Sequence, residues 1–501
     1  MNTAEAAKGA TTHPGQPGED RFGRIESAGI EYLPESERTS RPRNLFLVFF
    51  GGNFAFSVIV FGWLPITFGM DFIGAATACF VGIAVGTLLI APLAILGPRT
   101  GTNNAVSSGA HFGIRGRLIG SGLTLLFALA YAAIAVWTSG DALVAGANRF
   151  FGTPLNDTML AVGYAVIALE IILVALMGHG TVVAMQRFVA PIAGILLLIG
   201  IFAFAPGFDP SATQAGYLLG DFWPTWILTV VISAGGPLSY APTLGDYSRR
   251  ISRRKFSDRS VMIAACGGVF LGLYLSALFG AFTSVSLNAL GGSYVADLVA
   301  GSPAWYVLPI LIIALAGGLG QGVLNVYASG LDLEALIPRL KRVHTTLITS
   351  AAAIALLYLG VFVFNAVDSI TAMTLILNCC AGPWVVINVL GFLVVRRGRY
   401  DPADLQVFNE GRRGGRYWNF GGWNLRAVIP WATGSVVGVL LVETELYSGP
   451  LAGLAGGVDL SLAASILAAA GLYLIAVRLW PEPSTPSESK QGGDVILSRH
   501  D

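Results

Sequence analysis

Twelve apolar stretches of about 20 residues dominate this chain and limit what it can fold into. A helix of about 20 apolar residues is long enough to span the hydrocarbon core of a bilayer. The stretches cover residues 45–68, 72–96, 118–145, 159–176, 188–205, 222–244, 261–285, 306–331, 347–364, 370–395, 428–442 and 460–479. Only 12% of the 501 residues are charged, about half the share found in soluble domains. We therefore predict an all-α integral membrane protein with twelve transmembrane helices.

The positions of Lys and Arg set the orientation of these helices, because cytoplasmic loops are enriched in basic residues. With the N-terminus inside, Arg149 is the one basic residue that falls on the outer side. One helix more or fewer would put the basic clusters RRISRRK and RLKR on opposite sides. We expect a multi-pass protein of the plasma or inner membrane with both termini in the cytoplasm.

Two of the predicted helices carry residues that interrupt a helix. The first contains FFGGNFAF, and the sixth contains ISAGGPLSYAPTLGDYSRR, in which two prolines and three glycines fall within about ten residues. Interrupted helices at equivalent places in two halves of a chain are typical of inverted-repeat transporters, which bind substrate at the unwound backbone. The alternative is that these residues are merely frequent in membrane helices.

The interruptions suggest how the chain is divided. We predict a first repeat of five helices over residues 44–208 and a second over residues 209–400. A cytoplasmic loop and two extra helices then occupy residues 401–480. The flanking residues 1–43 and 481–501 are polar and rich in Gly, Pro or Ser, so we expect disordered cytoplasmic tails and no cleaved signal peptide.

Several classes of function are disfavoured. A net charge of +1 gives no reason to expect a nucleic-acid partner. The five His residues fall in tails or at loop ends, and the four Cys residues lie in apolar stretches without metal-ligand spacing. We therefore predict no enzyme, no catalytic residue and no metal site. No helix carries the repeated polar rings of a channel pore.

Four motifs, which occur in the same order as in the family, resemble those of the nucleobase:cation symporters, in particular the purine-cytosine permease branch. They are RIESAGIEYLPESERTSRPRNLFLVFFGGN, GPRTGTNNAVSSGAHFGIRG, GDYSRR and LNVYASGLDLEAL. The resemblance covers about residues 24–399. It implies a transporter whose flat substrate stacks between aromatic rings and forms hydrogen bonds with side-chain amides.

The resemblance also implies where those rings lie. In the family the third helix supplies a Trp and, four residues later, a Gln or Asn, which align here with Tyr131 and Ala135. The Trp of the sixth helix aligns with Tyr240, and Ser239 beside it becomes a further contact. Ala cannot hydrogen-bond, so one edge contact common in the family is missing.

The eighth helix carries Gln321 and Asn325, which are four residues apart and share one face. An unpaired amide in hydrocarbon is costly, so both are expected to face the bundle interior or a wet cavity. Asn325 matches the family's substrate-binding Asn. Asn53, in the first interruption, is a third amide expected at or near the pocket. The alternative for all three is a hydrogen bond between helices.

The coupling cation is predicted from the hydroxyl side chains that the eighth helix lacks. Sodium-coupled relatives use Ser or Thr hydroxyls there, whereas residues 316–320 offer none, and an intact helix does not expose its backbone oxygens. We therefore expect H⁺ rather than Na⁺ as the coupling cation and no other cofactor. Carboxyls within helices are the proton-carrier candidates, namely Asp141 and Glu170. Asp246, at a cytoplasmic end, is predicted to have a structural or gating role.

Taken together, these patterns predict a symporter that imports a nucleobase such as cytosine or a purine. It would work as a monomer in the lipid bilayer with a small molecule as its only other partner. Other neutral heterocycles (a hydantoin, allantoin or a vitamin-like compound), sodium coupling, an amino-acid substrate and a nutrient receptor on a transporter scaffold remain as alternatives.

Overall fold

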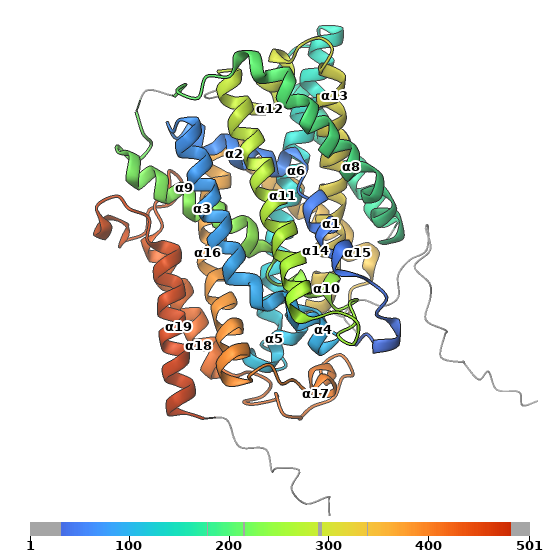
Figure 1. The fold of residues 1–501 in the computed structure, drawn as a ribbon, viewed down its shortest axis with the longest axis vertical. Helices are drawn as coiled ribbons and strands as arrows, with labels where there is room; N and C mark the ends of the chain where they lie inside the picture. The colour runs from blue at the N-terminus through green and yellow to red at the C-terminus, as the bar shows by residue number, and fades with distance from the viewer. Residues whose placement is uncertain (1–31, 178, 214–215, 289–292, 338, 482–501) are drawn as a thin grey trace, which may run out of the picture.

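The computed structural model describes residues 32–177, 179–213, 216–288, 293–337 and 339–481. These residues are helical apart from turns, loops and three isolated β-bridges, and they form no strand (Figure 1). Most of the two predicted tails, residues 1–31 and 482–501, lies outside the described residues.

Twelve membrane spans can be followed along the chain. They are α1 (Pro42–Gly51) with α2 (Phe56–Thr67), α3 (Phe72–Ile90), α6 (Leu118–Phe151), α7 (Asp157–Leu176), α8 (His179–Phe204), α9 (Phe222–Tyr240), α11 (Asp258–Ser286), α13 (Val307–Ile312) with α14 (Gly318–Leu336), α15 (Arg342–Tyr358), α16 (Ala366–Leu390), α18 (Leu425–Leu441) and α19 (Ser461–Leu479). Among the described residues eight helices are long and apolar enough to cross a membrane alone, and the bent pair α1–α2 makes a ninth. The remaining three spans, α8, α9 and α18, complete the predicted set of twelve.

The first span is broken between α1 and α2, where the two helices meet at an angle of 57°. The Asn53 side chain donates to the Phe49 carbonyl at 2.6 Å, and Ser276 donates to the Asn53 carbonyl at 2.8 Å. Irregular backbone at membrane depth requires such partners because no water is available there. The side chains around this break therefore make it possible.

The sixth span is broken in the same manner. Helix α9 ends at Tyr240, three residues turn, and the short α10 (Leu244–Ser248) continues toward the end of the molecule. Asn104, from α5 (Asn104–Phe112), donates to the Ala241 carbonyl at 2.7 Å within this turn. Both predicted interruptions are thus real breaks.

The eighth span differs from the prediction of an intact helix. It is π-helical over Ile313–Gly317, between α13 and α14. A π-turn shifts the backbone hydrogen-bond register, and such turns occur frequently at functional sites. The expectation of an intact α-helix is therefore wrong for residues 313–317.

The spans pack in two groups. The first group consists of α1, α2, α3, α9 and α11, and the second of α6, α7, α14 and α15. The last helices, α18 and α19, pack on α16 at the edge of the molecule (Figure 1). Figure 1 also shows α10, α5, α4 (Leu96–Thr100) and α17 (Pro402–Gln406) toward one end, and α12 (Tyr294–Gly301) and α13 toward the other.

Residues 32–41 differ from the predicted disordered tail. A short 3₁₀ turn forms at Glu35–Glu37, and Arg38 is buried and donates to the Pro98 carbonyl at 2.8 Å. The Ser40 amide donates to the Arg250 carbonyl at 2.9 Å. Composition alone pointed to a solvated tail, but these hydrogen bonds hold the segment against α4 and the chain after α10. We call residues 32–41 the N-terminal clip.

The loop after α16 packs on α5 at the same end of the molecule. His111 and the Tyr400 hydroxyl are 2.9 Å apart, and Arg396 donates to the Ala110 carbonyl at 2.8 Å. Burial and the charge of Arg396 lower the pKa of His111 to about 3. A neutral imidazole thus helps to hold this loop in place at physiological pH.

We predict that Gly62→Ala lowers the melting temperature of the detergent-solubilised protein. A Cβ atom at Gly62 would lie 1.7 Å from the Ala277 carbonyl oxygen, so α2 and α11 must separate, at a cost of at least about 1–3 kcal/mol. Gly122→Ala in α6 is the matched control, because a Cβ there meets nothing within 4 Å. Equal melting temperatures for the two variants would contradict the close approach of these helices.

Candidate functional site

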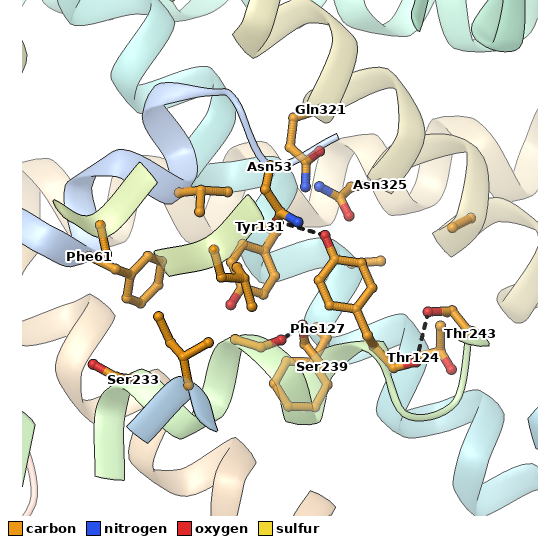
Figure 2. A pocket seen from close by; sticks show the side chains of 18 of the residues that line it. Asn53, Phe61, Thr124, Phe127, Tyr131, Ser233, Ser239, Thr243, Gln321 and Asn325 are labelled. Atoms are coloured by element: carbon orange, nitrogen blue, oxygen red, sulfur yellow. Dashed lines mark hydrogen bonds between the residues drawn. The ribbon is translucent and has the colours of Figure 1, made fainter. Parts of the chain in front are cut away.

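A cavity of about 100 Å³ lies between the two helix groups, beside both breaks (Figure 2). Drug-sized ligands occupy pockets of about 300–1,000 Å³, so this cavity suits a smaller molecule. Its polar lining residues are Asn53, Thr124, Tyr131, Ser233, Ser239, Tyr240, Thr243, Gln321 and Asn325. The residues that line it include no Asp, Glu, Lys, Arg or His.

The structure brings six predicted residues together at this cavity. Tyr240, Ser239 and Asn53 come from the first group of helices and its break. Tyr131 comes from α6, and Gln321 and Asn325 come from α14 of the second group. A ligand in the cavity would therefore contact both groups at once.

Asn53 lines the cavity, as expected, but its side-chain amide is bonded to other protein groups. Its side-chain oxygen accepts from the Tyr240 hydroxyl at 2.8 Å, and its nitrogen donates to the Phe49 carbonyl at 2.6 Å. Both ends of the amide are thus engaged by protein groups. The bond between Asn53 and Tyr240 joins the first and sixth spans, which was the alternative role considered for this amide. It also fixes the orientation of the Tyr240 ring.

The two tyrosine rings are held by different neighbours. The Tyr240 ring packs edge-to-face on Phe49, with centroids 5.4 Å apart. The Tyr131 ring lies 6.0 Å from that of Phe61, and its hydroxyl interacts with Ser239. Ser239 itself donates to the Gly236 carbonyl at 2.7 Å. Each helix group therefore places one tyrosine ring at the cavity.

The amides on α14 are in the opposite situation from Asn53. The Asn325 side-chain nitrogen is buried and has no hydrogen-bond partner in the described structure. The Gln321 side chain likewise makes no hydrogen bond to a described residue, and Figure 2 shows the two amides next to each other at the cavity. Because Asn325 also lines the cavity, its side-chain nitrogen is placed to donate a hydrogen bond to a ligand there.

Sequence reasoning missed several residues of the lining. Phe127 and Thr124 lie four and seven residues before Tyr131, on the same face of α6. Phe61 adds a further ring from α2, so the lining holds four aromatic rings. The helical spacing from Tyr131 would have identified Thr124 and Phe127, whereas nothing in the apolar run of α2 distinguishes Phe61.

The predicted carboxylates lie away from the cavity lining. Asp141 is buried, and it accepts hydrogen bonds from Tyr164 at 2.6 Å and Ser293 at 2.9 Å. Glu170 is exposed on the outer surface of α7. Asp246 lies on α10 and lines a different, larger cavity.

This larger cavity of about 1,320 Å³ is lined in part by Asp246 of α10 and by Glu37, Thr39 and Ser40 of the N-terminal clip. It shares Thr243 and Ala328 with the smaller cavity, and its charged lining residues are Glu37, Asp246, Arg249, Arg250 and Asp332. The two cavities therefore adjoin at Thr243 and Ala328, and the larger one extends to residues of the N-terminal clip.

A small cavity between two helix groups, at breaks in the first and sixth spans, is typical of secondary transporters. Residues 32–463 match the family described as permeases for cytosine/purines, uracil, thiamine and allantoin. The chain belongs to this nucleobase:cation symporter family and is a membrane transporter, not an enzyme, as predicted.

One relative is YxlA of Bacillus subtilis (strain 168), which is provisionally named a purine-cytosine permease. The two sequences are 24% identical over 471 residues, which is 91% of this chain and 96% of YxlA.

Solved structures show the same fold. Mhp1 in an inward-facing conformation superposes with a TM-score of 0.69 at 17% identity, covering 91% of this chain and 95% of Mhp1. Mhp1 closed around bromovinylhydantoin, a nucleobase-cation-symport-1 family transporter, gives 0.68 at 16% identity over the same shares of the two chains. A Na⁺-coupled sialic acid symporter gives 0.55 at 12% identity, over 89% and 92%. The predicted fold, twelve helices with an inverted five-helix repeat, is confirmed.

We predict that Asn53→Ala and Tyr240→Phe each weaken substrate binding by up to about tenfold. Each variant removes the same hydrogen bond, whose net contribution is about 0.5–1.5 kcal/mol. Because the two residues act as one unit, the double variant should be little weaker than either single variant. Tyr240→Ala should weaken binding more than Tyr240→Phe because it also removes the ring. Radioligand binding to purified protein measures all four; fully additive losses would show that the two side chains act independently.

Proposed function

We propose that the protein imports an uncharged nucleobase, such as cytosine or a purine, by alternating access. The observation that carries this proposal is the unpartnered Asn325 amide in a cavity with two aromatic faces and no charged lining residue. A nucleobase presents flat faces for stacking and edges of hydrogen-bond donors and acceptors. Stacking on Tyr131 and Tyr240 and an edge contact to Asn325 would together bind such a ring.

The uncharged lining narrows the choice of substrate. An amino acid needs partners for a carboxylate and an ammonium group, and a cationic vitamin such as thiamine would enter a cavity that has no anionic side chain to offset its desolvation. Neutral rings carry no such requirement. Hydantoins and allantoin share this neutrality, so they are the second choice among substrates.

Alternating access fits the two helix groups. The substrate would lie between them and be released through the larger cavity into the cytoplasm. The basic residues of the clip, of the chain after α10 and of the loop after α16 gather toward this end, which supports a cytoplasmic location for it and for both termini. One chain encloses the whole cavity, so a monomer in the plasma or inner membrane is sufficient.

We further propose protons as the coupling cation. Residues 316–320 carry no hydroxyl, whereas Asp141 is a buried carboxyl within a span. Its donors Tyr164 and Ser293 lie on α7 and directly before α12, so a change in its charge would alter how these elements are held. The exposed position of Glu170 makes it the weaker of the two candidates.

We predict that Asn325→Ala lowers nucleobase affinity by about 10–100-fold, because about 1–3 kcal/mol is lost when a hydrogen-bonding partner in a buried site is removed. Uptake into proteoliposomes should fall to background. Ser329→Ala is the control on the same helix, since its hydroxyl bonds the Val326 carbonyl and does not line the cavity. Normal uptake by Asn325→Ala would refute the site, and binding without accumulation by the parent protein would indicate a receptor.

Uptake should depend on an inward proton gradient, collapse with an uncoupler and change little when choline replaces sodium. Asp141→Asn should abolish gradient-driven accumulation but spare the exchange of internal for external base, since exchange needs no net proton movement. Glu170→Gln is the control and should accumulate normally. Uptake that rises with sodium at constant pH and survives the uncoupler would replace this mechanism with sodium coupling.

A further inference from the structure

The larger cavity has two parts that differ in character. Asp246 and Asp332 lie three and four residues after Thr243 and Ala328, so these carboxylates line the part that adjoins the small cavity. The other part is mainly apolar and is lined by α1, α8 and α11. Figure 1 shows α1 lying between α11 and α8. We call this apolar part the lateral groove.

The lateral groove opens on the surface that faces the lipid. Its floor is formed by Leu45, Leu197 and Phe279, whose side chains are buried. The apolar side chains at its opening are exposed, and they include Leu47, Val48, Ile195, Leu198, Ile201 and Leu275. Exposed apolar side chains are usual on a membrane span, but these surround a cavity with a buried floor. Because the opening faces hydrocarbon, a hydrocarbon chain is what fills this space and regains its dispersion contacts.

The lateral groove is long enough for an acyl chain. On α1 its lining runs from Asn44 to Gly52, which is about 12 Å of helix. A Cβ atom at Gly272 of α11 would lie 2.8 Å from the Phe50 carbonyl oxygen, so this part of α11 is level with the end of α1. The lining then continues on α11 from Leu275 to Phe282 for about 10 Å more. Together the two stretches exceed the thickness of one leaflet, about 15 Å of a core of about 30 Å.

The end of the groove beside the N-terminal clip is polar and carries more basic than acidic residues. Arg249 and Arg250 line it together with Glu37. Arg43 is exposed and lies four residues before Leu47, so it shares the face of α1 that lines the groove. Guanidinium groups bind phosphate oxygens in pairs, and basic pockets between membrane helices bind anionic lipid headgroups.

We propose that the lateral groove binds an anionic phospholipid from the leaflet beside the N-terminal clip. One acyl chain lies between α1 and α8 and reaches α11, and the phosphate lies at Arg43 and Arg250. A free phosphate would leave the apolar groove unfilled, whereas a phospholipid matches both the apolar groove and its basic end. The bound chain forms one wall of the larger cavity, next to the part that adjoins the small cavity. This site is separate from the proposed substrate site and does not depend on which substrate is carried.

The test reconstitutes the purified full chain with phosphatidylglycerol that carries a photoreactive group in one acyl chain, or with phosphatidylcholine that carries the same group. Labelled peptides are identified by mass spectrometry after illumination. We expect phosphatidylglycerol to label residues 44–54, 191–201 and 275–282 several-fold more strongly than the exposed face of α19. Phosphatidylcholine should label the groove and α19 about equally. Equal labelling of the groove and α19 by phosphatidylglycerol would show bulk lipid only and overturn the proposal, and so would equal enrichment of both lipids in the groove.

Two variants test the two ends of the lipid separately. Arg43→Gln should lower groove labelling by phosphatidylglycerol about fivefold, the effect of one basic residue near an anionic headgroup. Its control is Arg413→Gln, an exposed arginine in the loop after α16. Leu198→Trp should lower the labelling of α1 and α11 by filling the groove, whereas Leu467→Trp, at an exposed position of α19, should not. Unchanged groove labelling in either Arg43→Gln or Leu198→Trp would overturn the proposal.

Discussion

Inside a bilayer every backbone N–H and C=O must find a partner within the protein, and this requirement shapes the whole site. At the break in the first span Asn53 and Ser276 bond the carbonyls of Phe49 and Asn53, and in the sixth span Asn104 bonds the turn after α9. The same breaks bring Tyr240 and Ser239 to the cavity. The side chains that make irregular backbone tolerable are thus also those that set the geometry of the binding site.

The two helix groups contribute different kinds of side chain to the cavity. The first group contributes a ring, Tyr240, whose orientation is fixed by Asn53. The second contributes the ring of Tyr131 and the two amides of α14, which have no such restraint among the described residues. A flat ligand would fill the space between the groups and satisfy polar atoms that are otherwise unpaired. Its binding energy therefore depends on the distance between the groups, which is the quantity that changes during alternating access.

The sequence was a good guide wherever a strong local rule applied. The length of apolar runs predicted the twelve spans, and the glycines and prolines predicted both breaks. Motif alignment brought Tyr131, Tyr240 and Asn325 to one cavity. The sequence was a poor guide where a residue's role depends on the direction in which its side chain points. Glu170 lies in an apolar run but is exposed, and the amide of Asn53 is bonded to Tyr240. The π-turn before Gly318 and the packing of the N-terminal clip depend on tertiary contacts that no local pattern records.

The uncharged lining of the cavity has an electrical consequence. A neutral ligand among neutral side chains feels no net force from the membrane potential, which acts on a full charge with about 2.3 kcal/mol per 100 mV. Any voltage dependence of the cycle must then arise from the coupling ion or from charged residues outside this cavity, such as those of the larger one. The net charge that crosses the membrane for each neutral substrate molecule consequently equals the total charge of the coupling ions transported with it.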